Sequence, residues 1–233
     1  RCATLLITIA LIATVLSQGN PPPTHAACEI PSEWSGFLSQ VLSLGELGAE
    51  YNIGQVYYSQ HLERVRVDII DGATNIGGTV NSYSVSVWQD FTNEIEYVLD
   101  RDDNTCTSIP LIRKFGTGQL PENVYFGGSV MAGGQAVHEY FFTSTVDSHT
   151  FQIEVGLTTG ACLPFNVDVF NATATGQPQN MVMVEAFLNQ IPMVPPFVLD
   201  IPSMCTQSNS NILTRPKVIK ARESVHMHSM AMG

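Results

Sequence analysis

FLNQIPMVPPFVLDIPSMC, residues 187–205, is the stretch of sequence that decides the fold. It holds four prolines, a single charged residue, and a cysteine at its end. Proline lacks the backbone N–H and fixes φ, so the stretch predicts neither a helix nor a central strand. It is nevertheless as apolar as a protein core. We therefore expect an apolar strap that lies over a β-sheet and is tied down through its cysteine.

From residue 28 onward, short runs alternate between apolar and polar side chains, which is typical of strands with one buried face. These runs are residues 63–68, 82–87, 94–99, 151–157 and 165–169, and a more uniformly apolar run covers residues 181–186. Turn signals separate the runs at Asp71-Gly72, Gly77-Gly78, residues 102–104, residues 116–118, Gly133-Gly134 and residues 175–178. No long stretch has a helical period with caps. The pattern predicts an all-β antiparallel sandwich or barrel with few helices.

The two ends of the chain differ from its centre. Residues 1–16 combine an initial arginine with a short apolar run, the layout of a secretory signal peptide, with a membrane anchor as the alternative. Residues 207–233 are polar, then basic, then rich in His and Met, with too little apolar patterning to pack. We expect a signal peptide and short linker over residues 1–27, one domain over 28–206, and a disordered tail over 207–233.

Four cysteines follow the expected signal segment: Cys28, Cys106, Cys162 and Cys205. An even number in a secreted chain favours two disulfides. None of them has the Cys-x-x-Cys spacing of zinc or redox motifs. Four cysteines allow three pairings, and these spacings do not choose among them.

Charge is distributed unevenly. Residues 28–206 hold five Lys and Arg against twenty Asp and Glu, a net charge of −15, whereas residues 207–233 hold four against one, a net charge of +3. An acidic domain repels phosphate backbones, which argues against a nucleic-acid partner.

One short segment is a candidate calcium site. Asp100, Asp102, Asp103 and Asn104 place four oxygen-bearing side chains within five residues, a density suited to Ca²⁺. The segment lacks the glycine and the distal glutamate of an EF-hand. Because Asp and Asn also favour turns, a plain turn is the alternative. No other cofactor is expected.

Three further patterns bear on modification and chemistry. Asn171-Ala172-Thr173 is a standard sequon, and we expect Asn171 to carry an N-glycan. His226 and His228 with nearby methionines could ligate copper, but a flexible tail is the favoured interpretation. The sequence has no Gly-x-Ser-x-Gly, no His-Glu-x-x-His and no phosphate-binding glycine loop, so we expect no enzyme.

A series of short motifs follows one order along residues 28–205. They are Cys28 with Pro31, Trp34 and Gly36; Glu96-Tyr97 before Cys106 and Pro110-Leu111; Asn123 with Phe126-Gly127-Gly128; Cys162 with Pro164; and Phe187, Asn189, Pro195-Pro196, Pro202 and Cys205. In this order and with these four cysteines, the chain resembles the ependymin-related family of secreted proteins. It departs from that family by lacking a further cysteine pair that vertebrate members often carry, and by its basic tail.

The resemblance implies a half-open antiparallel β-sandwich of two sheets around an apolar pocket, similar to the bacterial lipoprotein carriers. It implies the pairings Cys28–Cys162 and Cys106–Cys205. It also implies a homodimer, a hydrophobic or lipid ligand, calcium association, N-glycosylation, and contact with cells and with extracellular matrix such as collagen. The expected location is extracellular, with the lysosomal lumen as a second possibility.

The apolar faces of the expected strands supply the candidate pocket wall. Its residues are Val65, Val67, Tyr83, Val85, Val87, Ile95, Tyr97, Phe126, Phe141, Phe151, Ile153, Val155, Met181 and Met183. Plain core is the default interpretation of such residues, because burial needs no ligand. Two functions stay open: a secreted carrier of a hydrophobic ligand, and a structural matrix glycoprotein whose acidic surface meets collagen or cells.

Overall fold

The computed structural model describes residues 28–43, 48–111, 114–116, 118–122, 124–146, 149–171 and 181–206. The expected signal segment, the basic tail and the histidines considered for copper lie outside the described residues. Within the described part of the chain, no helix is long and apolar enough to cross a membrane.

Over this part, the chain forms eleven strands and one short helix. The strands are β1 (Glu33–Ser43), β2 (Gly48–Ser59), β3 (Arg64–Ile76), β4 (Thr79–Asp90), β5 (Ile95–Asp100), β6 (Thr105–Pro110), β7 (Tyr125–Ala132), β8 (Gln135–Val146), β9 (His149–Thr158), β10 (Pro164–Asn171) and β11 (Met181–Ile191). The helix, α2, covers Ser203–Thr206.

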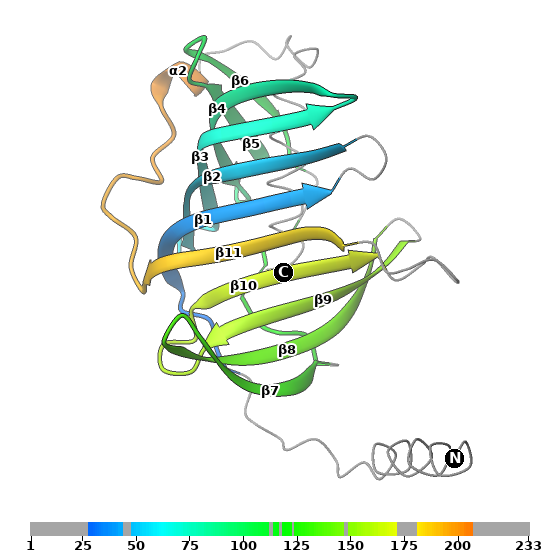
Figure 1. The fold of residues 1–233 in the computed structure, drawn as a ribbon. Helices are drawn as coiled ribbons and strands as arrows, with labels where there is room; N and C mark the ends of the chain where they lie inside the picture. The colour runs from blue at the N-terminus through cyan, green and yellow to red at the C-terminus, as the bar shows by residue number, and fades with distance from the viewer. Residues whose placement is uncertain are drawn as a thin grey trace, which may run out of the picture.

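All eleven strands belong to one antiparallel sheet with the order β6-β5-β4-β3-β2-β1-β11-β10-β9-β8-β7 (Figure 1). The prediction of an all-β antiparallel fold is confirmed. The strands that the resemblance divides between two sheets are joined here by hydrogen bonds into one, because β11 pairs with β1 on one side and β10 on the other.

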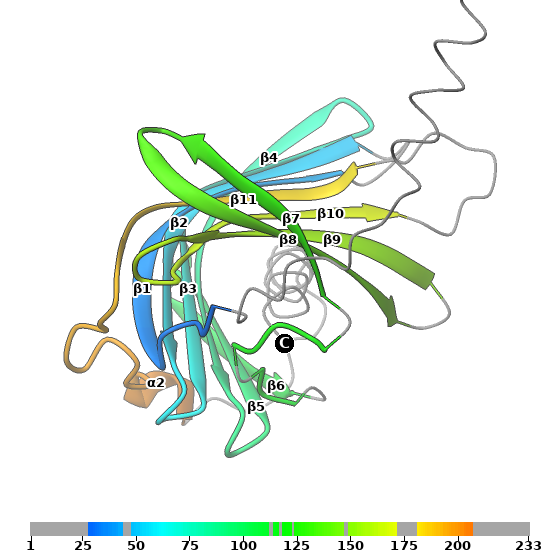
Figure 2. The same ribbon diagram turned by 90° about the horizontal axis from the view of Figure 1, so that it is seen from below.

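The sheet is strongly curved, and its two faces differ (Figure 2). Because neighbouring side chains of a strand point to opposite faces, every second residue shares a face. One face carries the main hydrophobic cluster, which draws residues from β1 to β5 and from β8 to β11, including Trp34, Leu38, Val87, Val155 and Phe187. We call this concave side the inner face, and the opposite side the outer face.

The proline-rich stretch divides into a strand and a strap. Residues 187–191 complete β11, a central strand, so the prediction that residues 187–205 exclude such a strand is wrong for its first five residues. Pro192 lies immediately after the last strand residue, where its missing N–H breaks no ladder. Residues 192–206 then run over the outer face to α2 (Figures 1 and 2). The expected strap is therefore shorter than its apolar sequence suggests.

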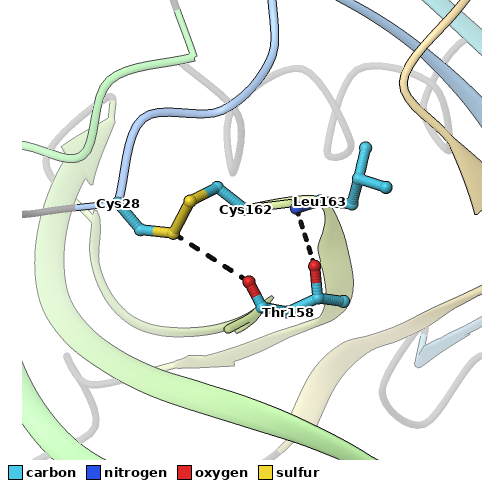
Figure 3. Close-up of a disulfide and its surroundings, with 4 residues drawn as sticks. All are labelled: Cys28, Thr158, Cys162 and Leu163. Atoms are coloured by element: carbon cyan, nitrogen blue, oxygen red, sulfur yellow. Dashed lines mark hydrogen bonds between the residues drawn. A yellow bond between two sulfur atoms is a disulfide. The ribbon is translucent and has the colours of Figure 1, made fainter. Parts of the chain in front are cut away.

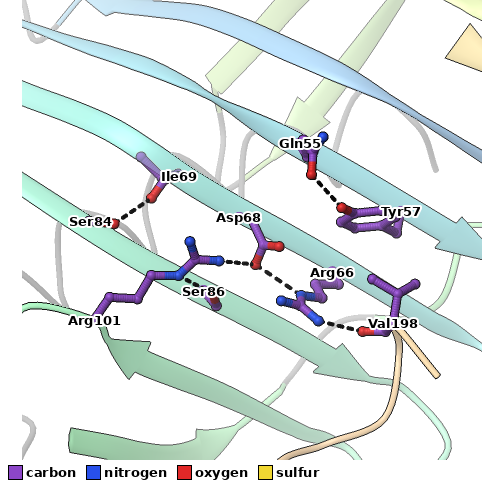
Figure 4. A network of polar contacts seen from close by, with 9 residues as sticks. All are labelled: Gln55, Tyr57, Arg66, Asp68, Ile69, Ser84, Ser86, Arg101 and Val198. Atoms are coloured by element: carbon purple, nitrogen blue, oxygen red, sulfur yellow. Dashed lines mark hydrogen bonds and ion pairs between the residues drawn. The ribbon is translucent and has the colours of Figure 1, made fainter. Parts of the chain in front are cut away.

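Contacts to the outer face hold this strap in place (Figure 4). Arg66 donates to the Val198 carbonyl oxygen at 2.6 Å, and its guanidinium lies 4.5 Å from the centre of the Trp88 ring. Asp68 accepts from Arg66 and also from Arg101, at 2.9 Å each. The strap thus covers a second hydrophobic cluster formed by Trp88, Tyr97, Cys106 and Cys205.

Two disulfides close the structure, with the pairings that the resemblance implies. Cys106 in β6 bonds Cys205 in α2, and Cys28 bonds Cys162 in the turn between β9 and β10. Thr158 organises that turn, because its hydroxyl accepts from the Leu163 N–H at 3.0 Å (Figure 3). The two bonds fix both ends of the described chain to the sheet.

Most of the turn predictions that fall on described residues are confirmed. Gly77-Gly78 and Gly133-Gly134 form hairpin tips, and all four glycines have positive φ. Asp71-Gly72 is an exception, because it lies inside β3 beside a register shift, and the predicted turn at residues 116–118 is only partly described. A Cβ on Gly72 would lie 2.5 Å from the Tyr83 ring, so this glycine serves a close contact within the sheet and not a turn.

Candidate functional site

Most of the candidate pocket residues lie together on the inner face. Eight belong to its buried hydrophobic cluster: Val65, Val67, Tyr83, Val85, Val87, Ile153, Val155 and Met183. Phe126 and Phe151 pack against this cluster and are partly buried. Met181 begins β11, and its side chain is outside the described part of the structure.

Three of the candidates lie on the outer face, and their assignment to the pocket wall is wrong. Ile95 and Tyr97 point away from Glu96 and Val98, and they belong to the cluster beneath the strap. Phe141 pairs with Glu154 and contacts Tyr125, opposite in direction to its buried neighbour Tyr140. The alternation rule fails in β5 because the strap gives the outer face a hydrophobic cover of its own.

A band of polar side chains crosses one end of the inner face. We call Gln40, Glu50, Asn52, Tyr83 and Glu185 the polar band; their relative exposures run from 0% to 4%. Gln40 donates to Glu185 at 2.5 Å, and Asn52 donates to Gln40 at 2.8 Å and to Glu50 at 3.0 Å. The hydroxyl of Tyr83 hydrogen-bonds Glu50, and it lies 2.6 Å from the amide oxygen of Asn52. Four strands, β1, β2, β4 and β11, therefore meet in one hydrogen-bonded network.

Tyr83, the titratable hydrogen-bond donor of the polar band, stays protonated. Burial raises the pKa of Tyr83 far above its ordinary value, and the neighbouring Glu50 raises it further. Tyr83 is thus a neutral hydrogen-bond donor across the physiological pH range. Together the amides and the phenol direct their hydrogens toward two buried carboxylates.

Sequence patterns did not reveal the polar band. In β2 the residues Tyr51 and Ile53 alternate with Glu50 and Asn52, which favours placing the two apolar side chains inside. The structure places them on the outer face, because Val56 and Tyr58 set the opposite phase further along the same strand. The change of apolar phase between residues 53 and 56 is the signal that could have revealed the buried polar residues.

Aromatic side chains form the other end of the inner face. Trp34 stacks on Tyr58, whose ring stacks on Phe115, with centroid distances of 6.2 and 5.4 Å. Tyr58 donates to the Gly116 carbonyl oxygen at 2.9 Å, and burial raises its pKa to about 12. The loop residues Phe115 and Gly116 thus close this end over the aromatic row.

The aspartates considered for calcium form a hydrogen-bonded turn. Asp100 is buried, and its Oδ1 accepts from the backbone N–H groups of Asp102 and Asp103 at 3.0 and 3.2 Å. Asn104 adopts positive φ, as turn residues of its type do. Across the described residues, no three His, Cys, Asp or Glu side chains come together as a group that could hold a metal ion. The geometry supports the turn interpretation of this segment.

The glycosylation candidate lies at a strand end. Asn171 is the last residue of β10, and Ala172 and Thr173 fall outside the described residues. N-glycosylation of Asn171 therefore stays a prediction.

Comparison with known proteins leaves the geometry as the evidence for a function. No protein-family model matches this chain, and no curated protein sequence matches it either.

Proposed function

We propose that the chain is an ependymin-like secreted glycoprotein, without enzymatic activity, that binds a hydrophobic or lipid ligand on the inner face of its sheet. The observation that carries this proposal is the pairing of two surfaces on one concave face. A broad apolar cluster from β3, β4 and β8 to β11, whose members are 0–7% exposed, lies beside the polar band. The hydrocarbon chain of an amphiphile would contact the apolar residues, and its polar head group would contact the polar band. Apolar burial supplies about 25 cal/mol per Å² to such binding.

The order of the described sheet leaves two edge strands. The order begins with β6 and ends with β7, so these two strands are its edges. Two disulfides fit an oxidising, extracellular setting, in agreement with a secreted carrier. Their pairing also agrees with the resemblance to the ependymin-related proteins.

Ligand analysis of the secreted protein tests this proposal. Native mass spectrometry followed by solvent extraction should release a bound lipid, and a fluorescent fatty acid should bind the extracted protein. Val155→Phe, which enlarges a fully buried inner side chain, should weaken probe binding tenfold or more. Val41→Phe makes the same change on the outer face, where Val41 is 46% exposed, and should leave binding unchanged. Empty preparations together with no probe binding would refute a lipid ligand.

A second candidate function is supported by the outer face. Glu139, Glu154 and Asp168 lie near one another across β8, β9 and β10. Burial and the neighbouring carboxylates raise the pKa of Glu154, so a cation is favoured beside it. We propose that a structural matrix glycoprotein would use this acidic strip for contact with collagen. Collagen binding that survives lipid extraction and is lost in Glu154→Gln with Asp168→Asn would favour this function.

Self-association is the remaining partner proposal. Phe37, Val41 and Leu188 are 41%, 46% and 52% exposed on neighbouring outer-face strands. An exposed apolar group of this kind supports a homodimer that packs outer face on outer face. Sedimentation of the secreted protein should give a dimer, and Phe37→Asp should give a monomer.

A further inference from the structure

The two edge strands of the sheet differ in how well they are protected. β6 is six residues long and ends in Pro110, and its Cys106 is bonded to Cys205 in α2. Short length, proline and a covering segment are devices that keep other strands from pairing with an edge. β7 is eight residues long and contains neither proline nor a charged residue. In the described sheet, β7 therefore lacks most of the protection that β6 has.

The part of β7 that follows its bulge is straight and exposed. The register shifts between Phe126 and Gly128, and residues 128–132 then pair with β8 without interruption. Of these residues, Val130 is 40% exposed and Met131 is 71% exposed. Alternate backbone N–H and C=O groups of an edge strand point away from the sheet. Residues 128–132, which we call the β7 edge, thus offer hydrogen-bonding groups and apolar side chains to one extended segment.

The outer face beside the β7 edge is acidic. Gly128 pairs with Glu139 in β8, and Glu139 is one of the carboxylates that raise the pKa of Glu154 in β9. The ion pairs among the described residues go to other carboxylates, those of Asp68 and Asp90. On its outer side, a segment added at this edge is therefore favoured if it carries positive charge.

The geometry at Gly128 leaves room for such a charge. A strand added beside β7 would lie roughly 10 Å from β8, which is two strand spacings. A Cβ on Gly128 would meet nothing within 4 Å, so a long basic side chain can cross this glycine toward Glu139. Met131 lies three residues from Gly128 and therefore on the inner side of the strand. The added strand should be basic on its outer side and apolar on its inner side.

The tail of this chain contains a segment with that pattern. Residues 217–222, KVIKAR, are called the basic segment here. In an extended conformation, alternation places Val218, Lys220 and Arg222 on one side, with Ile219 and Ala221 on the other. Two positive charges would then lie on the side of Glu139, and two apolar side chains on the side of Met131. The β-branched pair Val218-Ile219 also favours a strand.

The length of the tail allows the basic segment to reach the β7 edge. Cys205 is bonded to Cys106, so the tail starts beside β6, the opposite edge of the sheet. Fourteen residues, 111–124, connect β6 to β7, although Phe115 in this connection turns aside to stack on Tyr58. Eleven residues lie between Thr206 and Val218, a span of at most about 40 Å. The tail can therefore follow a similar path between the two edges.

We propose that the basic segment adds to the sheet of its own chain as one further strand beside the β7 edge, with Lys220 and Arg222 directed toward Glu139 and Glu154. The added strand pairs the outward backbone groups of β7 and covers Met131. It protects this edge from pairing with other chains, as a cap that a competing strand has to displace. The pairing is independent of the proposed ligand.

Hydrogen exchange in the full chain tests the pairing. The outward amide groups of the β7 edge should be protected, and Lys220→Glu should speed their exchange at least tenfold, because it places a third carboxylate beside Glu139 and Glu154. Lys114→Glu is the matched control, since it makes the same charge change at an exposed lysine outside the basic segment and should leave the exchange unchanged. Equal exchange in the parent and in both variants would overturn the pairing.

A charge swap identifies the partner of Lys220. Glu139→Lys alone should also speed the exchange of the β7 edge, and its combination with Lys220→Glu should restore the protection, because the two signs are exchanged. If the combined variant exchanges as fast as either single variant, the contact between Lys220 and Glu139 is refuted. Exchange that slows as the protein concentration rises would assign the basic segment to a second copy and overturn pairing within one chain.

Zero-length carbodiimide coupling keeps the test decisive if Glu139→Lys fails to fold. In the unchanged chain, Lys220 should couple to Glu139 or Glu154. Coupling of Lys220 only to acidic residues of β2 to β5 would refute the proposal.

Discussion

At the scale of single residues, surroundings decide whether a carboxylate stabilises this fold. Burial by itself raises the pKa of Asp90, but hydrogen bonds from Asn93 and from the Arg64 guanidinium outweigh it and hold the pKa below its ordinary value. Among the described residues Glu154 has no such donors, and burial together with Asp168 and Glu139 raises its pKa. The two residues should therefore respond to acid in opposite ways.

Asp90→Asn should destabilise the protein by about 1–3 kcal/mol at pH 7, because a hydrogen-bonded charge is lost. A lowered native pKa gives stability that is present above the unfolded pKa near 3.8 and is lost as the pH falls through the native value. The difference between variant and parent should thus shrink below pH 3.8. Urea unfolding at pH 7 and pH 3 measures it, with the exposed Asp71→Asn as a control that changes little.

Glu154→Gln should stabilise the protein at pH 7 by about 0.5 kcal/mol, the scale of partly exposed charge interactions. Its raised native pKa means that the charged form is disfavoured in the fold, so the parent loses stability as the pH rises from about 4.5 through the native value. Below pH 4.5 the two proteins should unfold alike. If Glu154→Gln is still more stable than the parent protein at pH 3, an electrostatic origin of the stabilisation is contradicted.

At the scale of elements, the strap explains where sequence patterns succeeded and where they failed. Alternation identified β3, β4, β9 and β10, since each has one apolar face on the main cluster. It misplaced Ile95 and Tyr97 because a sheet covered on both sides has no unique hydrophobic face. Alternation did not predict the polar band for a related reason. In this part of β2, the face that carries Tyr51 and Ile53 is more apolar than the face that is buried. No periodicity rule contains the information that a distant segment will cover the outer face.

Cys205→Ser should release the strap and expose one thiol at Cys106. The bond closes a segment with a sequence separation of 99, so its loss should cost about 4–5 kcal/mol in the chain-entropy model. Alkylation and peptide mapping of the variant locate the thiol. A free thiol at Cys28 or Cys162 would contradict the pairing.

Gly72→Ala should destabilise β3 by about 1–3 kcal/mol, because the new methyl group would meet the Tyr83 ring at 2.5 Å. Displacing Tyr83 would also disturb its hydrogen bond to Glu50 in the polar band. Gly160→Ala is a matched control, since a Cβ there meets nothing within 4 Å. Thermal unfolding should show a lower midpoint temperature for Gly72→Ala and almost no change for Gly160→Ala.

At the scale of the whole molecule, the all-β class followed from the density of alternating runs and turn signals. The pairing of the cysteines did not follow from their spacings and was obtained from the resemblance. The joining of all strands into one sheet could not be read from either, because it depends on β11 pairing with β1, which is far away in sequence, as well as with the preceding strand β10. Such long-range pairing leaves no local mark on the chain.

The central position of β11 also governs the order in which this protein can be built. Strands β1 to β6 form one consecutive meander, and β7 to β10 form another. As the chain emerges during synthesis, each meander can form, but the edges of β1 and β10 stay open until residues 181–191 arrive. Open edges recruit other strands, so a chain interrupted before β11 is a template for aggregation. The sheet is complete only when β11 has paired with both β1 and β10. The Cys106–Cys205 bond also has to wait for this strand, because Cys205 follows β11 in the chain.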